Sequence, residues 1–315
     1  MKTSKAICRQ PNPKNSSHFR HQLYRNIPLY LMLIIPMAYI IIFCYVPMAG
    51  IVAAFKKFSI FQSIWECPWV GFTYFKEAFH TKAFWEALKN TLILNLGDQL
   101  FIFPLPIILA VLMNELRSEK MKKFSQTIMY LPHFLSTVII VGIIYQVFSG
   151  TGVVNNILTS LGFDAVDFLG NSWNWRFVYW GSALWAGAGY GMIVYLAAMA
   201  GINTELYDAA YIDGASRWQR IWHVTLPQIK PTIITILIMD MGKLFSIGFE
   251  KPYLMGNVMV KDASEVISTY VYSVGLQGGR YDFATAIGLF QSVIALILVL
   301  GANWFAKKIG EEGLI

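Results

Sequence analysis

Three ionisable side chains, Asp98, Asp240 and Lys243, interrupt stretches of the sequence that are otherwise apolar. A charge inside an apolar segment is costly, and by default it marks a site that handles polar solutes, ions or protons. Asp240 and Lys243 are three residues apart, as neighbours on a helix face are, so an internal ion pair is a competing interpretation. Asp98, flanked by Asn95 and Gln99, is expected either to face a solute or to bond a neighbouring helix.

Aromatic and amide side chains in the same apolar stretches suit a carbohydrate, because sugars offer hydroxyls to polar groups and CH faces to aromatic rings. We expect a solute pathway to draw on Asp98, Gln146, Tyr190, Tyr195, Asp240, Lys243 and Phe249. Aromatic residues make up 15% of the chain. Most of them must belong to the core or to an aromatic belt at the membrane interface, so each assignment competes with a packing role.

Motifs for catalysis or nucleotide binding are not found in the sequence. A Walker A loop requires Gly-x4-Gly-Lys-[Ser/Thr], and around Gly242-Lys243 the first glycine is Leu237 and the hydroxyl residue is Leu244. No Cys/His pair has zinc-site spacing, and His133 and His223 are isolated. We therefore expect no catalytic residue, no metal and no cofactor in this chain, which is predicted not to be an enzyme.

The most informative segment is the polar loop 204–228. Its composition predicts two short helices hinged at Gly214, because glycine adopts backbone angles that other residues resist. Ser216 followed by Gln219 fits a capping box that opens the second helix. Pro227 is expected to end that helix, and Pro231 to open the next apolar segment.

The first of these helices carries small side chains, Ala209 and Ala210, with Ala215 following the hinge. Such a face can seat in a groove of another protein. Trp218 and Trp222, one turn apart, are expected to brace the loop against the apolar helices. A simple connection is the alternative, but two ordered helices exceed what a connection needs. The loop is therefore predicted to receive a partner's motion and to pass it on.

The composition indicates that the residues discussed above belong to a membrane protein. Of 315 residues, 56% are hydrophobic and only 14% are charged, against about 25% charged in soluble domains. No Asp, Glu, Lys or Arg occurs in 26–55, 124–163 or 177–204, and a membrane span needs roughly 20 apolar residues. We predict an all-α protein with six spans, at about 28–55, 90–113, 124–148, 177–203, 231–249 and 283–305.

Charge predicts the topology. Fifteen of the 25 Lys and Arg residues fall on the side that holds both termini, and nine on the other. The positive-inside rule then places both termini in the cytoplasm of a multi-pass plasma-membrane protein. The net charge of +7 is explained by this topology, and we predict no nucleic-acid partner. The first apolar run is too long for a cleavable signal sequence, whose core is about 7–15 residues.

The loop resembles the EAA loop of permease subunits of ATP-binding cassette importers. That pattern is Glu-Ala-Ala, three residues, Gly, nine residues, Ile, one residue, Leu-Pro. Here it is met by Asp208-Ala209-Ala210, Gly214, Val224 and Leu226-Pro227, with Asp for Glu and Val for Ile. Further segments resemble LplB-type polysaccharide permeases: Tyr30-Leu31-Met32-Leu33, Pro68-Trp69-Val70-Gly71-Phe72, Tyr130-Leu131-Pro132-His133-Phe134, Gly275-Leu276-Gln277 and Gly310-Glu311-Glu312-Gly313-Leu314.

The resemblance implies a type I importer permease with a MetI-like fold, similar in architecture to maltose permeases. It implies a tail (1–27), a first transmembrane helix with an extracellular loop (28–85), a transmembrane domain (86–306) and a C-terminal tail (307–315). It also implies an ATPase-coupling loop built from Glu205, Asp208, Ala209, Ala210, Asp213, Gly214, Ala215, Leu226 and Pro227.

The implied partners are a second homologous permease, two cytoplasmic subunits that bind ATP and Mg, and an extracellular solute-binding lipoprotein. The implied cargo is an oligosaccharide or polysaccharide fragment. Two alternatives stay open from the residues alone. The same machine could import a non-sugar solute such as an amino acid, or the chain could be an ion-coupled carrier. The carrier would use Asp98 and Asp240 but would leave the loop at 205–227 unexplained.

Overall fold

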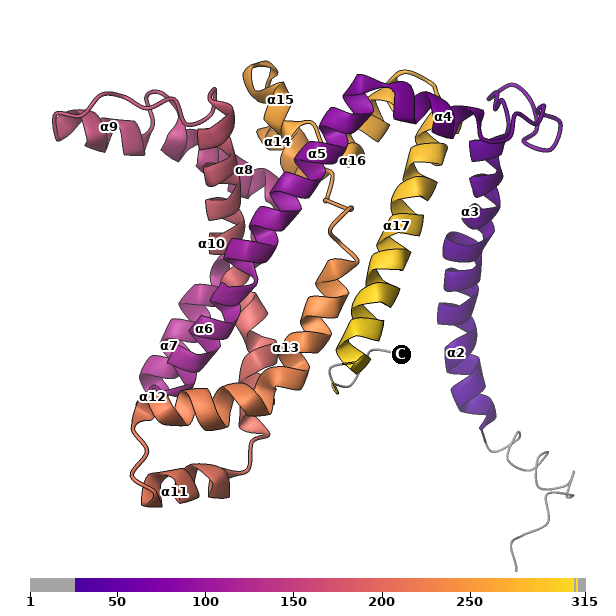
Figure 1. The fold of residues 1–315 in the computed structure, drawn as a ribbon. Coiled ribbons are helices and arrows are strands. Elements are labelled where there is room, and N and C mark those ends of the chain that lie inside the picture. The colour runs from indigo at the N-terminus through magenta and orange to yellow at the C-terminus, as the bar shows by residue number, and fades with distance from the viewer. Residues whose placement is uncertain (1–25, 309, 311–315) are drawn as a thin grey trace, which may run out of the picture. The chain divides into compact units, whose positions relative to one another are not determined.

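The computed structural model describes residues 26–308 and Gly310, and these residues are almost entirely helical (Figure 1). The predicted basic N-terminal tail and the remainder of the predicted C-terminal tail lie outside the described residues. Contacts divide the chain into two compact units between Val52 and Ala53. Within the described part, six helical stretches are long and apolar enough to cross a membrane, namely 27–55, 82–114, 137–160, 172–200, 217–241 and 281–308.

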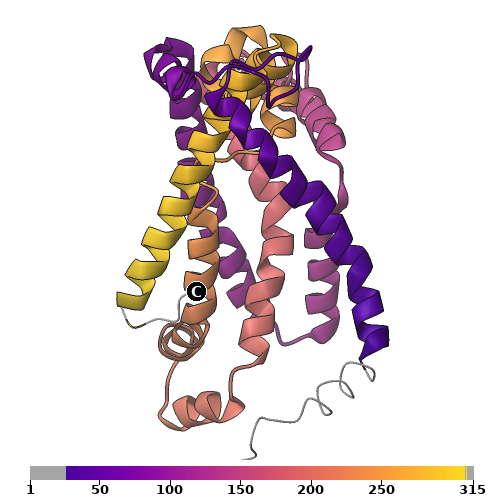
Figure 2. The same ribbon diagram turned by 90° about the vertical axis from the view of Figure 1, so that its right-hand side faces the viewer.

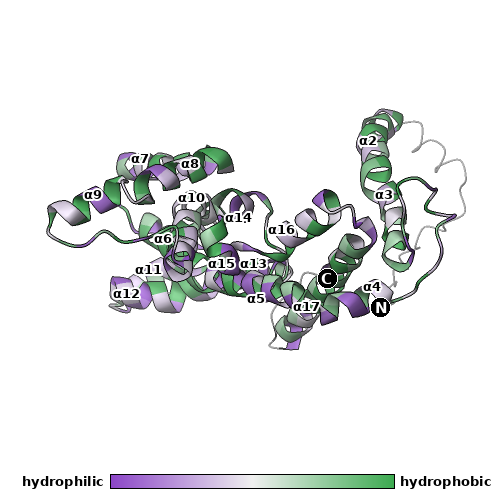
Figure 3. Cartoon of the chain, turned by 90° about the horizontal axis from the view of Figure 1, so that it is seen from above, coloured by the Kyte–Doolittle hydropathy of each residue, from purple (hydrophilic) through white to green (hydrophobic). Residues whose placement is uncertain are grey.

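The first unit is one apolar helical rod. It consists of α2 (Ile27–Ile40), the π-helical turn η1 (Ile41–Tyr45) and α3 (Val46–Met48), and it continues into the 3-10 helix η2 (Ala49–Phe55). Hydrophobic residues dominate α2 in Figure 3. The predicted first span, 28–55, coincides with this rod.

The second unit opens with α4 (Thr73–His80), followed by a long tilted helix. That helix is built from α5 (Lys82–Gly97), the π-helical turn η3 (Asp98–Ile102) and α6 (Pro104–Asn114), and it packs along α10 (Ser172–Ala200). A π turn adds a residue to the helical register and often marks a functional position.

The third predicted span, 124–148, is broken. It is formed by α7 (Glu119–Tyr130), the 3-10 turn η4 (Leu131–Phe134) and α8 (Thr137–Phe148), after which α9 (Val153–Ser160) turns away from the bundle (Figure 1). A 12-residue helix such as α8 rises only about 18 Å, which is less than the roughly 30 Å hydrocarbon core. The stretch long and apolar enough to cross a membrane is 137–160, which adds the residues of α9 to α8 and begins later than the predicted start at 124.

Small residues bring α10 close to its neighbours, as the run from Gly187 to Gly191 predicts. A Cβ built on Gly189 would overlap the carbonyl oxygen of Met129 in α7, and one built on Gly191 would lie 3.0 Å from Pro106 in α6. The glycines are thus required by the close packing of three helices.

The fifth span differs from its prediction. Helix α12 (Arg217–Arg220), the π-helical turn η5 (Ile221–Thr225) and α13 (Leu226–Met241) form one continuous helix. The expectation that Pro227 ends one helix and Pro231 opens another is therefore wrong. The π turn places Pro227 at the start of a new register, where its missing N–H is tolerated. The helix also ends at Met241, before the predicted limit at 249.

The segment after α13 forms a chain of short helices before the last span. They are α14 (Glu250–Met255), η6 (Val258–Val260), α15 (Lys261–Ser264), α16 (Ile267–Val271) and the π-helical turn η7 (Tyr272–Gln277). Helix is interrupted between α15 and α16, at Glu265 and Val266. Helix α17 (Tyr281–Lys308) is the last span.

An ion pair fastens the start of α17 to α4. The Arg280 guanidinium donates two hydrogen bonds, of 2.6 and 2.7 Å, to the Glu77 carboxylate. These hydrogen bonds hold the pKa of Glu77 below its ordinary value and raise the pKa of Arg280. The pair stands beside a buried aliphatic and aromatic cluster that includes Phe84, Ile267 and Phe283.

Candidate functional site

The polar loop forms a hinge between two helices at one end of the bundle. Helix α11 (Thr204–Ile212) lies crosswise to the spans (Figures 1 and 2), and the Asn203 side chain caps its first turn. Gly214 has a φ of 75°, in the left-handed region that side chains with a Cβ resist. Ser216 and Gln219 form the reciprocal capping box that opens α12. The predicted hinge and cap are therefore confirmed.

The residues predicted for coupling gather around this hinge. Glu205, Asp208, Ala209, Asp213, Gly214 and Pro227 are exposed, whereas Ala210, Ala215 and Leu226 are half-buried. A recess of about 270 Å³ lies between the two helices and is lined in part by Ala210, Asp213, Gly214 and Ala215. The loop thus presents a concave surface that is lined in part by small residues and is accessible to a partner.

One contact of the loop was not predicted, and one expected contact is not made. The hydroxyls of Tyr207 and Thr225 lie 2.9 Å apart and join α11 to the π turn η5. Trp218 and Trp222 are 69% and 64% exposed, so the expectation that they brace the loop within this chain is wrong. Tyr211 and Ile212, at the end of α11, are also exposed, which adds apolar area to the accessible face.

A cavity of about 930 Å³ lies between α5–α6, α10 and α13. Among the predicted pathway residues, it brings together Asp98, Tyr195, Asp240 and Lys243. Lys243 contacts Asp240 at 2.8 Å, which is the ion pair that their spacing allowed. Polar residues that the sequence did not single out as pathway members also line the cavity, namely Asn95, Gln99, Thr232 and Thr235. Thr232 and Thr235 could have been predicted, because two threonines three residues apart in an apolar helix lie on the same helix face.

The other predicted pathway residues lie outside the lining of this cavity. The ring of Tyr190 stacks on His133 with centroids 3.9 Å apart, Gln146 is exposed on α8, and Phe249 stacks on Tyr253 at 4.7 Å. Their roles as solute contacts stay predictions.

The short helices after α13 are held firmly against the spans. Both the Trp175 indole, at 2.9 Å, and the Tyr145 hydroxyl, at 3.3 Å, donate to the carbonyl of Met255. Lys251 donates to the carbonyl of Tyr179 at 2.7 Å and lies 3.9 Å from the centre of that residue's ring. Helix α14 is therefore fixed against α8 and α10.

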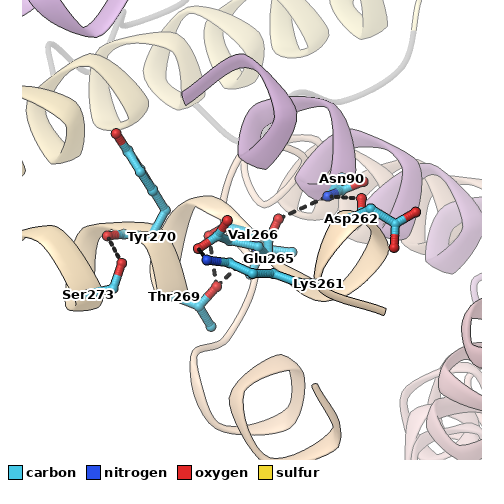
Figure 4. Close-up of polar contacts among 8 residues, drawn as sticks. All are labelled: Asn90, Lys261, Asp262, Glu265, Val266, Thr269, Tyr270 and Ser273. Carbon is cyan, nitrogen blue, oxygen red and sulfur yellow. Dashed lines mark hydrogen bonds and ion pairs between the residues drawn. The ribbon is translucent and has the colours of Figure 1, made fainter. Parts of the chain in front are cut away.

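Asn90 of α5 fixes the next part of the segment (Figure 4). Its amide donates to the carbonyls of Asp262 at 2.7 Å and Glu265 at 3.1 Å. Its oxygen accepts a 3.3 Å hydrogen bond from the buried Arg176. Polar anchors from α5 and α10 thus hold α15 in place at the end of the bundle opposite α11 (Figure 1).

Comparison with known proteins gives a consistent picture. Residues 102–311 match the family model described as binding-protein-dependent transport system inner membrane component. The chain is 44% identical to Protein LplB of Bacillus subtilis (strain 168) over 93% of this chain and 92% of that protein. It is 41% identical to the polygalacturonan/rhamnogalacturonan transport system permease protein YteP of the same organism, over 91% and 89%.

A solved structure also matches over nearly the whole length. It is the crystal structure of a bacterial alginate ABC transporter in complex with an alginate pentasaccharide-bound periplasmic protein. The TM-score is 0.86 at 42% identity, over 93% of this chain and 99% of that one.

Proposed function

Because the chain belongs to the family of binding-protein-dependent transport system inner membrane components, we propose a mechanism in which it carries oligosaccharides through the cavity described above. The chain is an oligosaccharide permease of an ATP-binding cassette importer. A solute-binding protein is the partner that delivers the sugar, and the related alginate transporter forms a complex with an alginate pentasaccharide-bound periplasmic protein. The permease YteP and the alginate transporter, which are 41% and 42% identical to this chain, are both named for acidic polysaccharides, so a polysaccharide fragment is the favoured cargo class.

One observation carries the mechanism: the helix 217–241 is unbroken from the loop to the cavity. It starts beside the hinge at Gly214 and ends beyond Asp240, and at about 1.5 Å per residue it spans about 37 Å. A displacement at the loop is therefore delivered directly to the wall that carries Thr232, Thr235 and Asp240.

The remaining parts of the proposal concern the other subunits. A second homologous permease completes the pathway, and two cytoplasmic subunits bind ATP and Mg and seat the α11 face. Their closure pushes on the loop, and the cavity changes the side to which it opens. The α11 end then faces the cytoplasm together with both termini, and the α14 end faces the binding protein. This chain itself holds no cofactor and catalyses no reaction.

The test is transport by the complete complex in proteoliposomes. Uptake of tritium-labelled trigalacturonate or galactotriose should require ATP on the side of the membrane where the ATPase subunits lie. It should also require the binding protein on the opposite side. Gly214→Val should abolish that uptake while the permease stays in the membrane. Uptake of both sugars that is insensitive to ATP, or driven by an ion gradient, would contradict the proposal.

A further inference from the structure

We infer that Asn95 and Gln291 are positioning residues for transport, which stop the winding of the fifth span and keep the segment 242–249 non-helical at the end of the cavity away from α11. The inference rests on the proposed function, since Lys243 and Leu244 of this segment line the same cavity. It goes beyond that function by assigning a role to one side chain on α5 and one on α17.

The first observation is that the chain leaves the helix at the cavity and becomes helical again only at α14. Helix α13 ends at Met241, α14 begins at Glu250, and the segment between them runs without helix (Figure 1). Its start is a tight turn, in which the N–H of Lys243 bonds to the Asp240 carbonyl at 2.9 Å and that of Ser246 to the Lys243 carbonyl at 2.8 Å. Non-helical backbone at membrane depth is tolerated only where it is buried in protein or lines a cavity. The carbonyls that follow this turn therefore need partners from elsewhere in the protein.

The second observation is that side-chain amides bind the next two carbonyls. The Asn95 amide donates to the carbonyl of Leu244 at 2.7 Å, and the Gln291 amide donates to the carbonyl of Phe245. Among the described residues, no backbone N–H donates to either carbonyl. Two adjacent carbonyls are thus fastened to two different spans, α5 and α17.

These two hydrogen bonds occupy the acceptors that would extend the fifth span. In an α-helix, the carbonyls of Leu244 and Phe245 would accept from the N–H groups four residues further on, those of Gly248 and Phe249. Neither of these two N–H groups donates to a backbone carbonyl of the described residues. They are therefore available to continue the helix once the side-chain amides are removed.

The third observation is that the segment packs on both sides. Ile247 belongs to the buried cluster that includes Trp180, and Phe245 packs against the cluster that includes Phe283. A helix continued past Met241 would turn each further residue by about 100°, so it would move both side chains and change the end of the cavity. Packing of these side chains without help from the amides is the alternative explanation for the path of the segment.

The test removes each donor at nearly constant volume. Asn95→Leu and Gln291→Met should each lower sugar uptake by the complete complex about tenfold, the loss expected when a buried carbonyl loses its partner. Asn95→Gln keeps an amide donor, and its longer side chain has room because position 95 borders the cavity. It should therefore recover uptake relative to Asn95→Leu. Ser292→Ala is the matched control, since that hydroxyl bonds within α17 to the Gly288 carbonyl.

The second measurement is hydrogen–deuterium exchange of the detergent-solubilised complete complex, read by mass spectrometry. Peptides that cover 247–250 should exchange about tenfold more slowly in Asn95→Leu and Gln291→Met than in the wild type, because their N–H groups gain helical partners. Exchange in α5 and α17 should stay as in the wild type, and Ser292→Ala should match the wild type throughout. A general loss of stability would instead speed exchange across the spans.

A direct contact with the sugar predicts a different pattern. Asn95 lines the cavity, whereas Gln291 lies outside its lining. Loss of a sugar contact would therefore impair Asn95→Leu alone and would leave exchange in 247–250 unchanged.

Several results would overturn the inference. They are uptake in Asn95→Leu or Gln291→Met equal to that in Ser292→Ala, no recovery in Asn95→Gln, or exchange in 247–250 that is unchanged or faster in the donor variants. Failure of the proposed function looks different, because the wild type would then show no uptake that depends on ATP and binding protein. The exchange comparison would still report on the segment in that case.

Discussion

At the scale of single residues, Gly214 is the position where the loop tolerates least change. Nothing lies within 4 Å of an added Cβ, so the cost of Gly214→Val comes from its φ of 75°. That strain is on the order of 1–3 kcal/mol, enough to misalign α11 without unfolding the spans. We expect membrane insertion to be normal, and uptake together with co-purification of the ATPase subunits to be lost.

Two comparisons sharpen this prediction. Asp208→Ala should be milder, because Asp208 is exposed and lies beyond the first turn of α11, so the change removes a surface charge without straining the backbone. Gly150→Val is a matched control, since that glycine also has open space around it but no positive φ. If Gly214→Val and Gly150→Val transport equally well, the hinge does not transmit motion.

The Glu77–Arg280 pair gives a second prediction at this scale. A carboxylate whose pKa is lowered by folding contributes stability above its unfolded pKa, and that contribution disappears as the pH falls through the folded value. With both side chains about 40% exposed (42% and 40%), the effect is that of a screened surface pair.

The melting temperature of the purified complex should therefore decrease as the pH is lowered from neutral to below 4.5, the ordinary pKa of the Glu77 carboxyl. Glu77→Gln should melt lower than the wild type at neutral pH, and the two should converge in acid. A constant difference between the two proteins across this range would refute the assignment.

At the scale of elements, the contact between Tyr207 and Thr225 decides how well α11 follows α13. Tyr207→Phe removes one hydrogen bond of about 0.5–1.5 kcal/mol and leaves the buried Thr225 hydroxyl without it. We expect the ATPase subunits to stay bound, with fewer sugars moved per ATP hydrolysed. Tyr39→Phe, at an exposed position of α2, is the control. An unchanged ratio of sugar uptake to ATP hydrolysis in Tyr207→Phe would show that coupling does not need the hydrogen bond between α11 and Thr225.

Local signals at this scale predicted well wherever one residue type enforces one geometry. The hinge at Gly214, the capping box at Ser216 and the close packing at Gly189 are of this kind. The prediction that Pro227 ends a helix was wrong because a π turn before Pro227 changes the register of the helix. Composition does not reveal a π turn. The break of the third span at Leu131–Phe134 was missed because continuous apolarity conceals it.

The site was predicted only in part for a related reason. Asp98, Asp240 and Lys243 stand out by their charge, and the structure collects them in one cavity. The aromatic candidates were chosen by type, and whether Tyr190 faces a cavity or stacks on His133 depends on tertiary packing. The anchoring of α14 by Lys251 and Trp175 also joins positions far apart in the sequence, which one sequence cannot pair.

At the scale of the whole molecule, topology follows from charge and remains a prediction. Reporter fusions after Ile315 and within 114–123 should report the cytoplasm, and fusions within 250–282 the outside, because fifteen of the 25 Lys and Arg residues lie on one side. A fusion within 123–136 or 149–152 tests the broken third span in the same experiment. A C-terminal reporter on the outer side would require an odd number of spans and would break the assignment of faces.

The central claim is that the loop moves the cavity wall through the helix 217–241, and the accessibility of Thr235 tests it most directly. In a complex whose native cysteines are replaced, Thr235→Cys would be labelled from the cytoplasmic side with a charged methanethiosulfonate reagent, with and without ATP and vanadate. The account predicts rapid labelling at rest, protection when nucleotide is trapped, and no protection in the Gly214→Val background. Labelling of Thr235→Cys that is unaffected by trapped nucleotide, or protected equally in the Gly214→Val background, would contradict it.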